Sequence, residues 1–497
     1  MGPEGGTMTK SYLGRNTSSV QVRNPMKNFW AIVLAAGEGM RMGAEHSKLL
    51  HPVLGRPMIY YPVNLCLRLG AQGVFVVAGT EVEAVAVKEA LAGQPVQFLE
   101  HGGPNGMVHA VLQAEAMVTD VGGTVLIFSG DTPPLREKTI RALLDTHHTV
   151  GAVATVVTAP LPEPNGRVRI LRDMVGPSTC IVDEIEATPR ERQITEVNTG
   201  CYCIARPLLF GALREIARSP GREEFSLRQL VEVFTKWGMP VHAVAVADPI
   251  EVMGINTPAE LAQATAILRQ RIHERLMSNG VTLLDPTTTY IDATVQVGSD
   301  TVIYPGVTLE GTTTIGSGCI LYPHCRLRDS QLGDGVTVLD GSVILQSDVA
   351  ADCIIGPYAH LRPGSRLQRK AKVGNFCEVK KAVIGEGSKV PHLSYIGDAT
   401  LGAKVNIGAG TIICNFDGFA KHQTLIEDDV FVGSNTNLVA PVNVGKGAII
   451  AAGSTITDRV PPDAVAFGRA PQVTKEGRAT ATRQKRQAMV PPKADED

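Results

Sequence analysis

Bulky aliphatic side chains recur at every sixth position through most of the second half of the chain. The first run is Ile291, Val297, Ile303, Leu309, Ile315, Leu321 and Leu327. The spacing returns in four further runs, 349–379, 384–396, 401–413 and 426–456. A period of six fits neither an α-helix nor a flat β-strand, whose side chains repeat every 3.6 and 2 residues. It is typical of a hexapeptide β-helix, in which each short strand contributes one inward aliphatic before the chain turns a corner.

Three such faces make one coil, so we expect residues eighteen apart, such as Ile291 and Leu309, to stack on each other. The position four residues after each aliphatic is often small or β-branched, as the narrow interior of a prism requires. These positions are Val295, Thr301, Val307, Thr313, Cys319 and Cys325. We therefore assign the two cysteines to core packing rather than to metal binding.

The six-residue period is broken between Ile413 and Ile426. The extra segment, 414–421, is predicted to form a loop that leaves the prism. Such a loop is either a tolerated insertion or part of a cleft, since loops on rigid scaffolds often carry function.

Length and composition limit the alternatives. A chain of 497 residues is too long for one core, so at least two domains are expected. The net charge of −2 gives no argument for nucleic acid or an anionic membrane as a partner, and no apolar run is long enough to span a membrane. The nine cysteines lack CxxC spacing, and residues 1–28 lack the apolar core of a secretory signal. We expect a disordered leading tail, reduced thiols and a cytoplasmic location.

The amino-terminal half alternates short apolar runs with segments of helical length. The runs are Trp30–Leu34, Val74–Val77, Val125–Phe128, Val153–Val157 and Val241–Val246. This alternation predicts an α/β domain with a mostly parallel sheet covered by helices on both faces. Ligands of such sheets bind beyond the carboxyl ends of the strands.

A glycine-rich turn follows the first of these runs. It begins with Leu34, Ala35, Ala36 and Gly37, and Arg41 and Lys48 come after it. Backbone N–H groups of such a turn and the two cations can bind a phosphate, although a plain strand–helix turn has the same composition. The dinucleotide fingerprint and the Walker A motif both fit poorly.

The run at Val125–Phe128 leads into Ser129, Gly130 and Asp131. A carboxylate at a strand end is a natural ligand for Mg²⁺, which prefers one or two carboxylates together with phosphate oxygens. The alternative is an aspartate that only stabilises a turn.

Several of these motifs resemble those of known enzyme families. The turn at 34–42 with Lys48, Gly130-Asp131, the segment Glu196–Gly200 and the segment Gly254–Asn256 are similar to those of sugar-1-phosphate nucleotidyltransferases. The segment Gly374–Gly418 is close to diagnostic for a hexapeptide acetyltransferase. Together, from about Phe29 to Gly477, the chain resembles the bifunctional UDP-N-acetylglucosamine pyrophosphorylase/glucosamine-1-phosphate N-acetyltransferase family.

The domain organisation follows from these patterns. Thr257 to Glu260 form a capping box with proline at the first helical position, so a helix is expected there. It would separate two independent active sites. We expect a tail at 1–28, a Rossmann-like nucleotidyltransferase domain at 29–256, a linker helix at 257–280, a left-handed β-helix acetyltransferase domain at 281–470, and a C-terminal tail at 471–497, disordered after Gly477. The left-handedness comes from the resemblance alone.

The resemblance implies that the carboxyl-terminal domain transfers an acetyl group from acetyl-CoA to glucosamine-1-phosphate. His392 matches the catalytic base, and backbone N–H groups at 408–410, with Asn415 and Ser434 nearby, are candidates for the oxyanion site. The family positions for the sugar phosphate are Arg362, Lys380, Tyr395, Asn406 and Lys421, and those for acetyl-CoA are Ala409, Asn415, Phe416, Ser434, Ala452 and Arg469. Phe416 stands where the family commonly has tyrosine. Family members are trimers with acetyl-transfer sites between subunits.

The amino-terminal domain is expected to transfer uridylyl from UTP to N-acetylglucosamine-1-phosphate. Arg41 and Lys48 would act on the phosphates, and Asp131 and Asn256 would hold Mg²⁺. The positions that match the family's nucleotide and sugar contacts are Leu34, Ala35, Ala36, Gly37, Lys48, His101, Gly106, Met107, Ser129, Gly130, Asp131, Gly166, Asp183, Asn198 and Asn256.

The uracil pocket departs from the family pattern. His101, Pro104 and Met107 replace two glutamines and a threonine, so side chains that would read the base are missing. Three hypotheses remain open: a bifunctional enzyme with a divergent base pocket, an acetyltransferase whose amino-terminal domain is weak or uses another nucleotide, and a trimeric scaffold without activity.

Overall fold

The computed structural model describes residues 29–35, 47–79, 81–99, 106–120, 122–162, 164, 168–172, 179–182, 187–218 and 227–490. The chain divides into two compact units, Met1–Leu268 and Arg269–Asp497. The division falls inside helix α7 (Pro258–Ser278) rather than at either end of it. The predicted domain limits at 256 and 281 stay a prediction.

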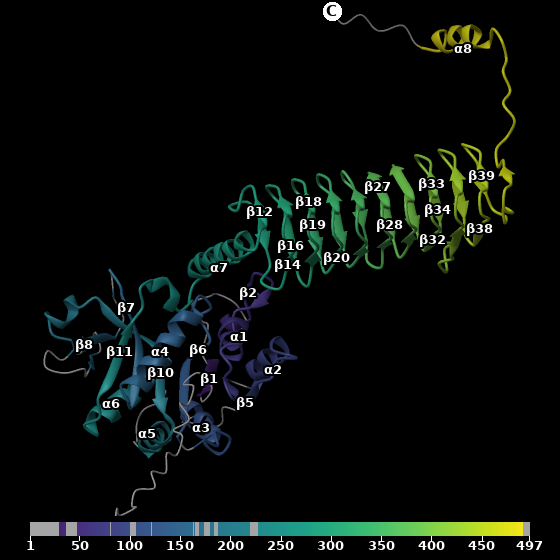
Figure 1. Cartoon of the computed structure of the whole chain (residues 1–497). Helices are drawn as coiled ribbons and strands as arrows, with labels where there is room; N and C mark the ends of the chain where they lie inside the picture. Colours follow the sequence, from purple (N-terminus) through teal and green to yellow (C-terminus); the bar gives the residue numbers. More distant parts are fainter. Residues whose placement is uncertain are drawn as a thin grey trace, which may run out of the picture. The chain divides into compact units, whose positions relative to one another are not determined.

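The first unit is built on a nine-stranded sheet (Figure 1). Its central order is β11-β7-β10-β6-β1-β4-β5, and β8 and β9 extend it beside β10. The strands are β1 (Phe29–Ala35), β4 (Val74–Ala78), β5 (Gln97–Leu99), β6 (Thr124–Ser129), β7 (Ala154–Pro160), β8 (Arg169–Arg172), β9 (Thr179–Val182), β10 (Glu196–Ala205) and β11 (Val241–Ala245). All five predicted apolar runs are strands. The sheet is mixed, because β10 lies antiparallel between β6 and β7.

Alternate residues of β1 enter two separate cores, one on each face of the sheet. Ala31 and Val33 belong to the core that α1, α2 and α4 cover, and Ile32 belongs to the core under α3, α5 and α6. The helices are α1 (Tyr60–Arg68), α2 (Glu81–Ala90), α3 (Gly106–Gln113), α4 (Glu137–Thr149), α5 (Arg206–Arg218) and α6 (Arg228–Lys236). Short elements complete the unit: β2 (Pro52–Val53), β3 (Arg56–Pro57), η3 (Lys48–Leu50), η4 (Ala114–Ala116), η5 (Glu191–Gln193) and η6 (Pro249–Val252). The arrangement is the three-layer α/β fold that the sequence predicts.

Helix α7 begins with the expected capping box. The Thr257 hydroxyl accepts from the Glu260 N–H at 3.2 Å, and the Glu260 carboxylate accepts from the N–H groups of Thr257 and Asn256 at 2.9 and 2.7 Å. Leu268 packs into the core of the first unit, and Leu276, further along the helix, is also buried.

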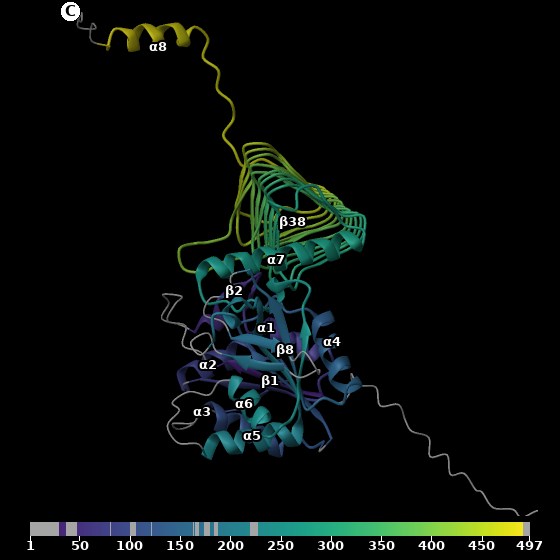
Figure 2. The same cartoon turned by 90° about the vertical axis from the view of Figure 1, so that its left-hand side faces the viewer.

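The second unit is a triangular prism of parallel strands, seen end-on in Figure 2. Three sheets of eleven, ten and nine strands form its faces. The first face contains β12 (Thr282–Leu283), β15 (Val302–Ile303), β18 (Ile320–Leu321), β21 (Thr337–Val338), β24 (Ile354–Ile355), β27 (Lys372–Asn375), β30 (Lys389–His392), β33 (Asn406–Ile407), β36 (Phe431–Val432), β39 (Ile449–Ile450) and β41 (Val465–Ala466). This is the parallel β-helix expected from the hexapeptide period, with the left-handedness that the resemblance implies.

The other two faces have the same construction. The second face contains β13 (Tyr290–Ile291), β16 (Thr308–Glu310), β19 (Arg326–Arg328), β22 (Val343–Leu345), β25 (His360–Leu361), β28 (Glu378–Lys380), β31 (Tyr395–Gly397), β34 (Ile412–Cys414), β37 (Asn437–Val439) and β40 (Thr455–Ile456). The third contains β14 (Gln296–Val297), β17 (Thr314–Ile315), β20 (Gln331–Leu332), β23 (Asp348–Val349), β26 (Arg366–Leu367), β29 (Val383–Ile384), β32 (Ala399–Leu401), β35 (Thr424–Ile426) and β38 (Val442–Val444).

The period-six aliphatics form the core of the prism. Ile291 pairs with Leu309 and Leu309 with Leu327, so the predicted stacking is confirmed. Every aliphatic of the series is buried except Val297, which is half-buried. Small polar residues in the interior bond to neighbouring coils, as when the Thr301 hydroxyl donates to the Gly316 carbonyl at 2.9 Å. Interior hydroxyls of this kind are satisfied within the prism, whereas the buried Thr424 hydroxyl has no partner among the described residues.

One expectation for the C-terminal tail is wrong. Part of the segment after Gly477 forms helix α8 (Arg478–Gln487), whose residues are all exposed. Among the helices that the structure describes, none is long and apolar enough to cross a lipid bilayer.

His147 gives the first unit a pH-dependent stability. Its ring in α4 is 4 % exposed and its Nδ1 lies 3.0 Å from the Thr155 hydroxyl. Burial, with smaller contributions from His148 and His242, lowers the pKa of His147 from 6.5 to about 4. Below pH 6.5 His147 is protonated in the unfolded chain, whereas in the folded protein it stays neutral down to about pH 4. The free energy of unfolding therefore falls as the pH falls through that range.

We expect this one histidine to cost the first unit up to about 3 kcal/mol between pH 6.5 and 4. His147→Gln, which cannot titrate, should make unfolding less pH-dependent in that interval. Both tryptophans, Trp30 and Trp237, lie in the first unit, so tryptophan fluorescence of the whole protein during urea unfolding reports this transition. His109→Gln on the exposed side of α3 is the control. An unchanged pH dependence in His147→Gln would contradict the assignment.

Candidate active sites

Two strand ends of the first unit lie side by side. Leu34 of β1 pairs with Ser129 of β6, and the Gly130 N–H donates to the Leu34 carbonyl at 2.8 Å. A Cβ on Gly130 would lie 2.4 Å from Ile59 Cδ1, so a larger residue there would have to displace the buried Ile59 side chain. Asp131 is thus held at the carboxyl end of the parallel strands, the edge where such sheets bind ligands.

Lys48, Asp131 and Asn256 meet at this edge. The Lys48 ammonium donates to Asp131 Oδ2 at 2.5 Å and to Asn256 Oδ1 at 2.8 Å. The side chains of Lys48 and Asp131 are only 11 % and 14 % exposed. The Ile255 N–H also donates to the Asp131 carbonyl at 3.0 Å, which brings the segment before α7 to the strand end. Residues that the sequence assigned to phosphate and to metal therefore share one cluster.

The cluster suits a cation. Two hard oxygen atoms converge on one positive nitrogen, and Mg²⁺ prefers such oxygens together with substrate phosphates. Among the described residues, no group of three His, Cys, Asp or Glu side chains could hold a metal by itself. The residues fit a metal that arrives with a phosphate ligand, and the Lys48 ammonium would then have to turn away from the two oxygens.

Asn198 lies on β10, and each end of its side-chain amide has one hydrogen-bond partner. Its Nδ2 donates to the Tyr202 hydroxyl at 2.5 Å, and its Oδ1 accepts from the Gly200 N–H at 2.9 Å. Tyr202 is completely buried, and burial raises the pKa of its hydroxyl. Sequence reasoning missed Tyr202, because an aromatic residue in a strand signals only a core position.

Several predicted residues of the first unit cannot be placed. Ala36, Gly37, Arg41, His101, Gly166 and Asp183 lie outside the described residues. Ala35 is the last residue of β1, and Gly106 and Met107 open α3, with Met107 half-buried. The base pocket therefore stays a prediction from the sequence.

In the second unit, positive side chains gather beside the loop that breaks the period. Arg362 follows β25, Lys380 ends β28, and the loop contributes Lys421. Arg362 donates to Glu378 at 2.7 Å. The adjacent Lys421 ammonium, with smaller contributions from partial burial and from Arg362, lowers the pKa of Lys380. Two ammonium groups held together in this way form a natural anion site.

Tyr395 and Asn415 lie next to this cluster. Asn415 Nδ2 is 3.5 Å from the Tyr395 hydroxyl and donates to Asp398 Oδ2 at 2.5 Å. Both Asn415 and Asp398 are 7 % exposed. Phe416 projects from the loop and is 59 % exposed.

His392 stands at the corner between the first and second faces. It ends β30, pairs with Asn375 of β27, and its exposed ring places Nδ1 2.5 Å from Asn375 Oδ1. A column of corner residues continues upward from it through successive backbone bonds: Gly410 to His392, Asn435 to Ala409, and Gly453 to Ser434. Ala409, Ser434 and Ala452 therefore follow His392 along one corner, and Arg469 Cδ lies 4.0 Å from the Cβ position of Gly453. Four of the six predicted coenzyme residues thus form a line that leads to the predicted base.

Existing hydrogen bonds reduce the number of groups that could stabilise an oxyanion. The N–H groups of Gly408 and Gly410 already donate to the carbonyls of Val432 and His392, at 2.8 and 3.3 Å. In the described part of the chain the Ala409 N–H has no acceptor, and the Ser434 hydroxyl is exposed. These two groups remain as donors, whereas the amide nitrogen of Asn415 already donates to Asp398 and faces the Tyr395 hydroxyl.

Asn406 is not part of this group within one chain. It pairs with Lys389 and Phe431 on the first face, whereas Tyr395 lies on the second face. An exposed apolar row follows the corner below His392 and consists of Tyr358, Phe376 and Leu393, which are 57–58 % exposed. Their backbones are left-handed, with φ of 51–53°, which turns these side chains outward at the corner.

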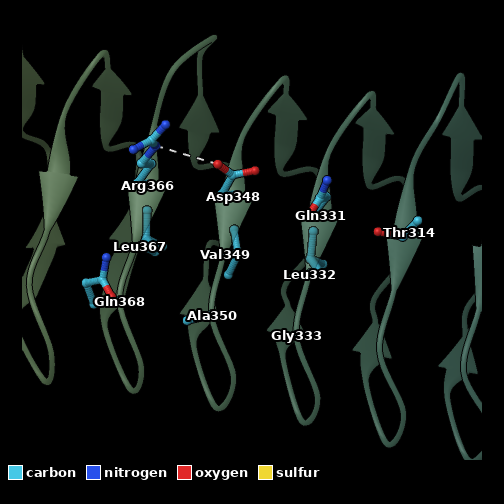
Figure 3. Close-up of a pocket in the computed structure, with 10 residues that line it drawn as sticks. All are labelled: Thr314, Gln331, Leu332, Gly333, Asp348, Val349, Ala350, Arg366, Leu367 and Gln368. Atoms are coloured by element: carbon cyan, nitrogen blue, oxygen red, sulfur yellow. Dashed lines mark ion pairs between the residues drawn. The ribbon is translucent and has the colours of Figure 1, made fainter.

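A shallow groove on the third face contains none of the predicted residues (Figure 3). Outward side chains of four successive coils line it, namely Thr314, Gln331, Asp348 and Arg366, and Arg366 lies 3.6 Å from Asp348. Both members of this ion pair are more than 60 % exposed, so the groove has the character of ordinary solvated surface.

Family models match both units. Residues 31–233 match the MobA-like NTP transferase domain, and residues 423–458 match the bacterial transferase hexapeptide repeat.

Relatives match nearly the whole chain. A relative named bifunctional protein GlmU from Geotalea uraniireducens is 45 % identical over 91 % of this chain and 99 % of its own length. Proteins of the same name from Heliobacterium modesticaldum and Halalkalibacterium halodurans are 46 % and 43 % identical over 90 % and 91 % of this chain, and 96 % and 98 % of theirs. With both units matched, the chain belongs to the family of bifunctional GlmU proteins, enzymes that join a nucleotidyltransferase domain to a hexapeptide acetyltransferase domain.

Proposed function

We propose that the chain makes UDP-N-acetylglucosamine in two steps. The prism transfers an acetyl group from acetyl-CoA to the 2-amino group of glucosamine-1-phosphate. The first unit then transfers uridylyl from UTP to the N-acetylglucosamine-1-phosphate and releases pyrophosphate. The observation that carries the proposal is the position of His392 at the end of the line of predicted coenzyme residues, in a prism whose second face also carries a cation cluster. These are the parts that acetylation of an anionic amine requires.

The cation cluster would hold the phosphate of the acceptor. Lys380 and Lys421 repel each other when the site is empty, and a phosphate between them would relieve that repulsion. The Arg362 guanidinium, already paired with Glu378, would offer a further donor. The phosphate would thus fix one end of the sugar while Tyr395 contacts the ring.

His392 would take the proton from the attacking amine. The Asn375 amide oxygen can only accept, so Nδ1 of His392 carries the hydrogen and Nε2 keeps its lone pair. The amine attacks the thioester carbonyl, the proton passes to Nε2, and the collapsing intermediate expels the CoA thiolate. The Ala409 N–H and the Ser434 hydroxyl would stabilise the oxyanion.

We also propose that the acetyl-transfer site forms between subunits of a homotrimer. The outward side chains of different prism faces diverge, so Asn406 and Tyr395 can serve one substrate only if they come from different chains. The exposed apolar row of Tyr358, Phe376 and Leu393 beside His392 supplies a surface for such contact. The other proposed partners are small molecules.

In the first unit, Asp131 and Asn256 would hold Mg²⁺ when it arrives with UTP. When bound, the metal would neutralise charge on the phosphates. Lys48 and Arg41 would bind the same phosphates. A bound metal would occupy the Asp131 and Asn256 oxygens that Lys48 contacts, so the Lys48 ammonium would then need the phosphates as its new partner. Asn198, fixed by Tyr202, would contact the sugar.

The altered base pocket favours one second candidate. His101, Pro104 and Met107 leave fewer groups to read uracil, so the first unit could be weak or accept another nucleotide. Comparing pyrophosphate release from UTP, dTTP, CTP, ATP and GTP separates the two possibilities.

A reciprocal pair of variants tests the two-step proposal. His392→Ala should lower kcat of acetyl transfer by about 10²–10⁴-fold and leave nucleotidyl transfer unchanged. Asp131→Asn should abolish nucleotidyl transfer at low Mg²⁺ and spare acetylation, because asparagine keeps the shape but loses the charge that holds a hard cation. Each activity is measured on the whole protein. A near-normal acetylation rate in His392→Ala, or full nucleotidyl activity in Asp131→Asn, would contradict the assignment.

The contact with Asn375 predicts a change in pH profile. Asn375→Asp keeps an acceptor for Nδ1 but adds a charge that stabilises the protonated ring. The pH below which acetyl transfer declines should therefore rise by about one unit. The measurement is kcat/KM against pH for acetylation. Asn437→Asp adds the same charge to the second face away from His392 and should not move the profile, and an unmoved profile in Asn375→Asp would rule out the contact.

A further inference from the structure

Asp398 is a buried carboxylate that neither the catalytic nor the binding assignments use. It lies at the corner between β31 and β32, where its backbone is left-handed with φ of 48°. It is 7 % exposed, and its carboxylate meets Asn415, seventeen residues further along the chain. Burying an ionised group is costly, so the residues that hydrogen-bond to Asp398 indicate what compensates its burial.

The contact with Asn415 fixes which way that amide faces. A carboxylate only accepts hydrogen bonds, so Asn415 Nδ2 must point to Asp398 Oδ2, 2.5 Å away. The amide oxygen Oδ1 then faces the other way, and no described residue donates to it. Gly397 leaves the space that these two side chains occupy, since a Cβ there would lie 2.4 Å from the Tyr395 hydroxyl and 2.8 Å from Asn415 Nδ2.

Asp398 also joins the loop to the coil beneath it. Its N–H donates to the Lys380 carbonyl at 3.0 Å, and its carbonyl accepts from the Thr424 N–H at 3.1 Å. Asp398 thus accepts hydrogen bonds from both sides of the loop: from the Asn415 side chain at its start and from the Thr424 backbone beyond its end. Lys421 is carried by the segment between them.

We propose that Asp398 is a positioning residue that turns the Asn415 amide oxygen toward the 2-amino group of the acceptor. This rests on the proposed acetyl transfer to glucosamine-1-phosphate. Asn415 then accepts a hydrogen bond from the amine and does not stabilise the oxyanion, because the two hydrogens of its amide nitrogen face Asp398 and the Tyr395 hydroxyl. The pair would select acceptors that carry a donor at C2 and hold the amine for attack.

The test compares two sugar phosphates that differ at C2. Calorimetry on the whole protein measures the Kd of glucosamine-1-phosphate and of 2-deoxyglucose-1-phosphate, which lacks the donor. We expect the wild type to prefer the amine by about 10-fold or more, the value of one hydrogen bond to a charged group. Asp398→Asn can donate to Oδ1 and release the amide, so the ratio of the two Kd values should fall to about 2-fold, because the loss of the Asp398 charge near Lys380 acts equally on both phosphates. A residue that only supports the fold would weaken both ligands equally, and that result would overturn the inference.

Two further variants make the result specific. Asp398→Asn combined with Asn415→Asp exchanges the partners, again leaves an acceptor facing the amine, and should restore the preference and the acetylation rate. Asp329→Asn is the matched control, since Asp329 has the same φ of 48° at a corner outside the site. Failure of the exchange to restore discrimination would count against the inference. If the wild type binds neither sugar phosphate, the proposed acceptor itself is wrong.

Discussion

Parallel stacking of short coils determines where each functional group of the second unit can lie. An inward aliphatic every sixth residue fixes the face and the height of every outward neighbour, because each strand hydrogen-bonds in register with the strand one coil away. Lys380, Tyr395 and His392 are presented on such strands, and the loop after Cys414 brings Lys421 to them. A rigid scaffold of this kind can hold two ammonium groups side by side although they repel each other.

The two sites handle positive charge in opposite ways. In the first unit the Lys48 ammonium is neutralised by Asp131 and lies almost out of solvent. In the prism Lys380 and Lys421 face each other, and of their neighbours Arg362 adds positive charge while Asp398 partly offsets it. The first arrangement suits a site whose ligand arrives with a metal that can replace the lysine. The second suits a site that binds a phosphate without a metal ion.

Much of the scaffold could be predicted from the sequence, because it depends on short-range periodicity. The inward aliphatics, the apolar strands of the first unit and the capping box of α7 all appear where the pattern places them. The antiparallel insertion of β10 was not predicted, since nothing local in Glu196–Ala205 indicates which strands it joins. The polar contacts were missed for a related reason. Asn375 with His392 and Asp398 with Asn415 are each seventeen residues apart, so they meet only because a coil there has that length.

The most direct test of this account is the affinity of the whole protein for glucosamine-1-phosphate when charges are removed from chosen faces. Lys380→Met with Lys421→Met should weaken binding by at least about 10-fold, since a hydrogen bond to a charged group is worth about 1.5–3 kcal/mol. Lys370→Met with Lys446→Met removes the same charge from the corner between the third and first faces, away from the proposed site, and should leave the affinity unchanged. Equal losses in the two double variants, or no loss in the first, would contradict a phosphate site built by the stacking of the second face.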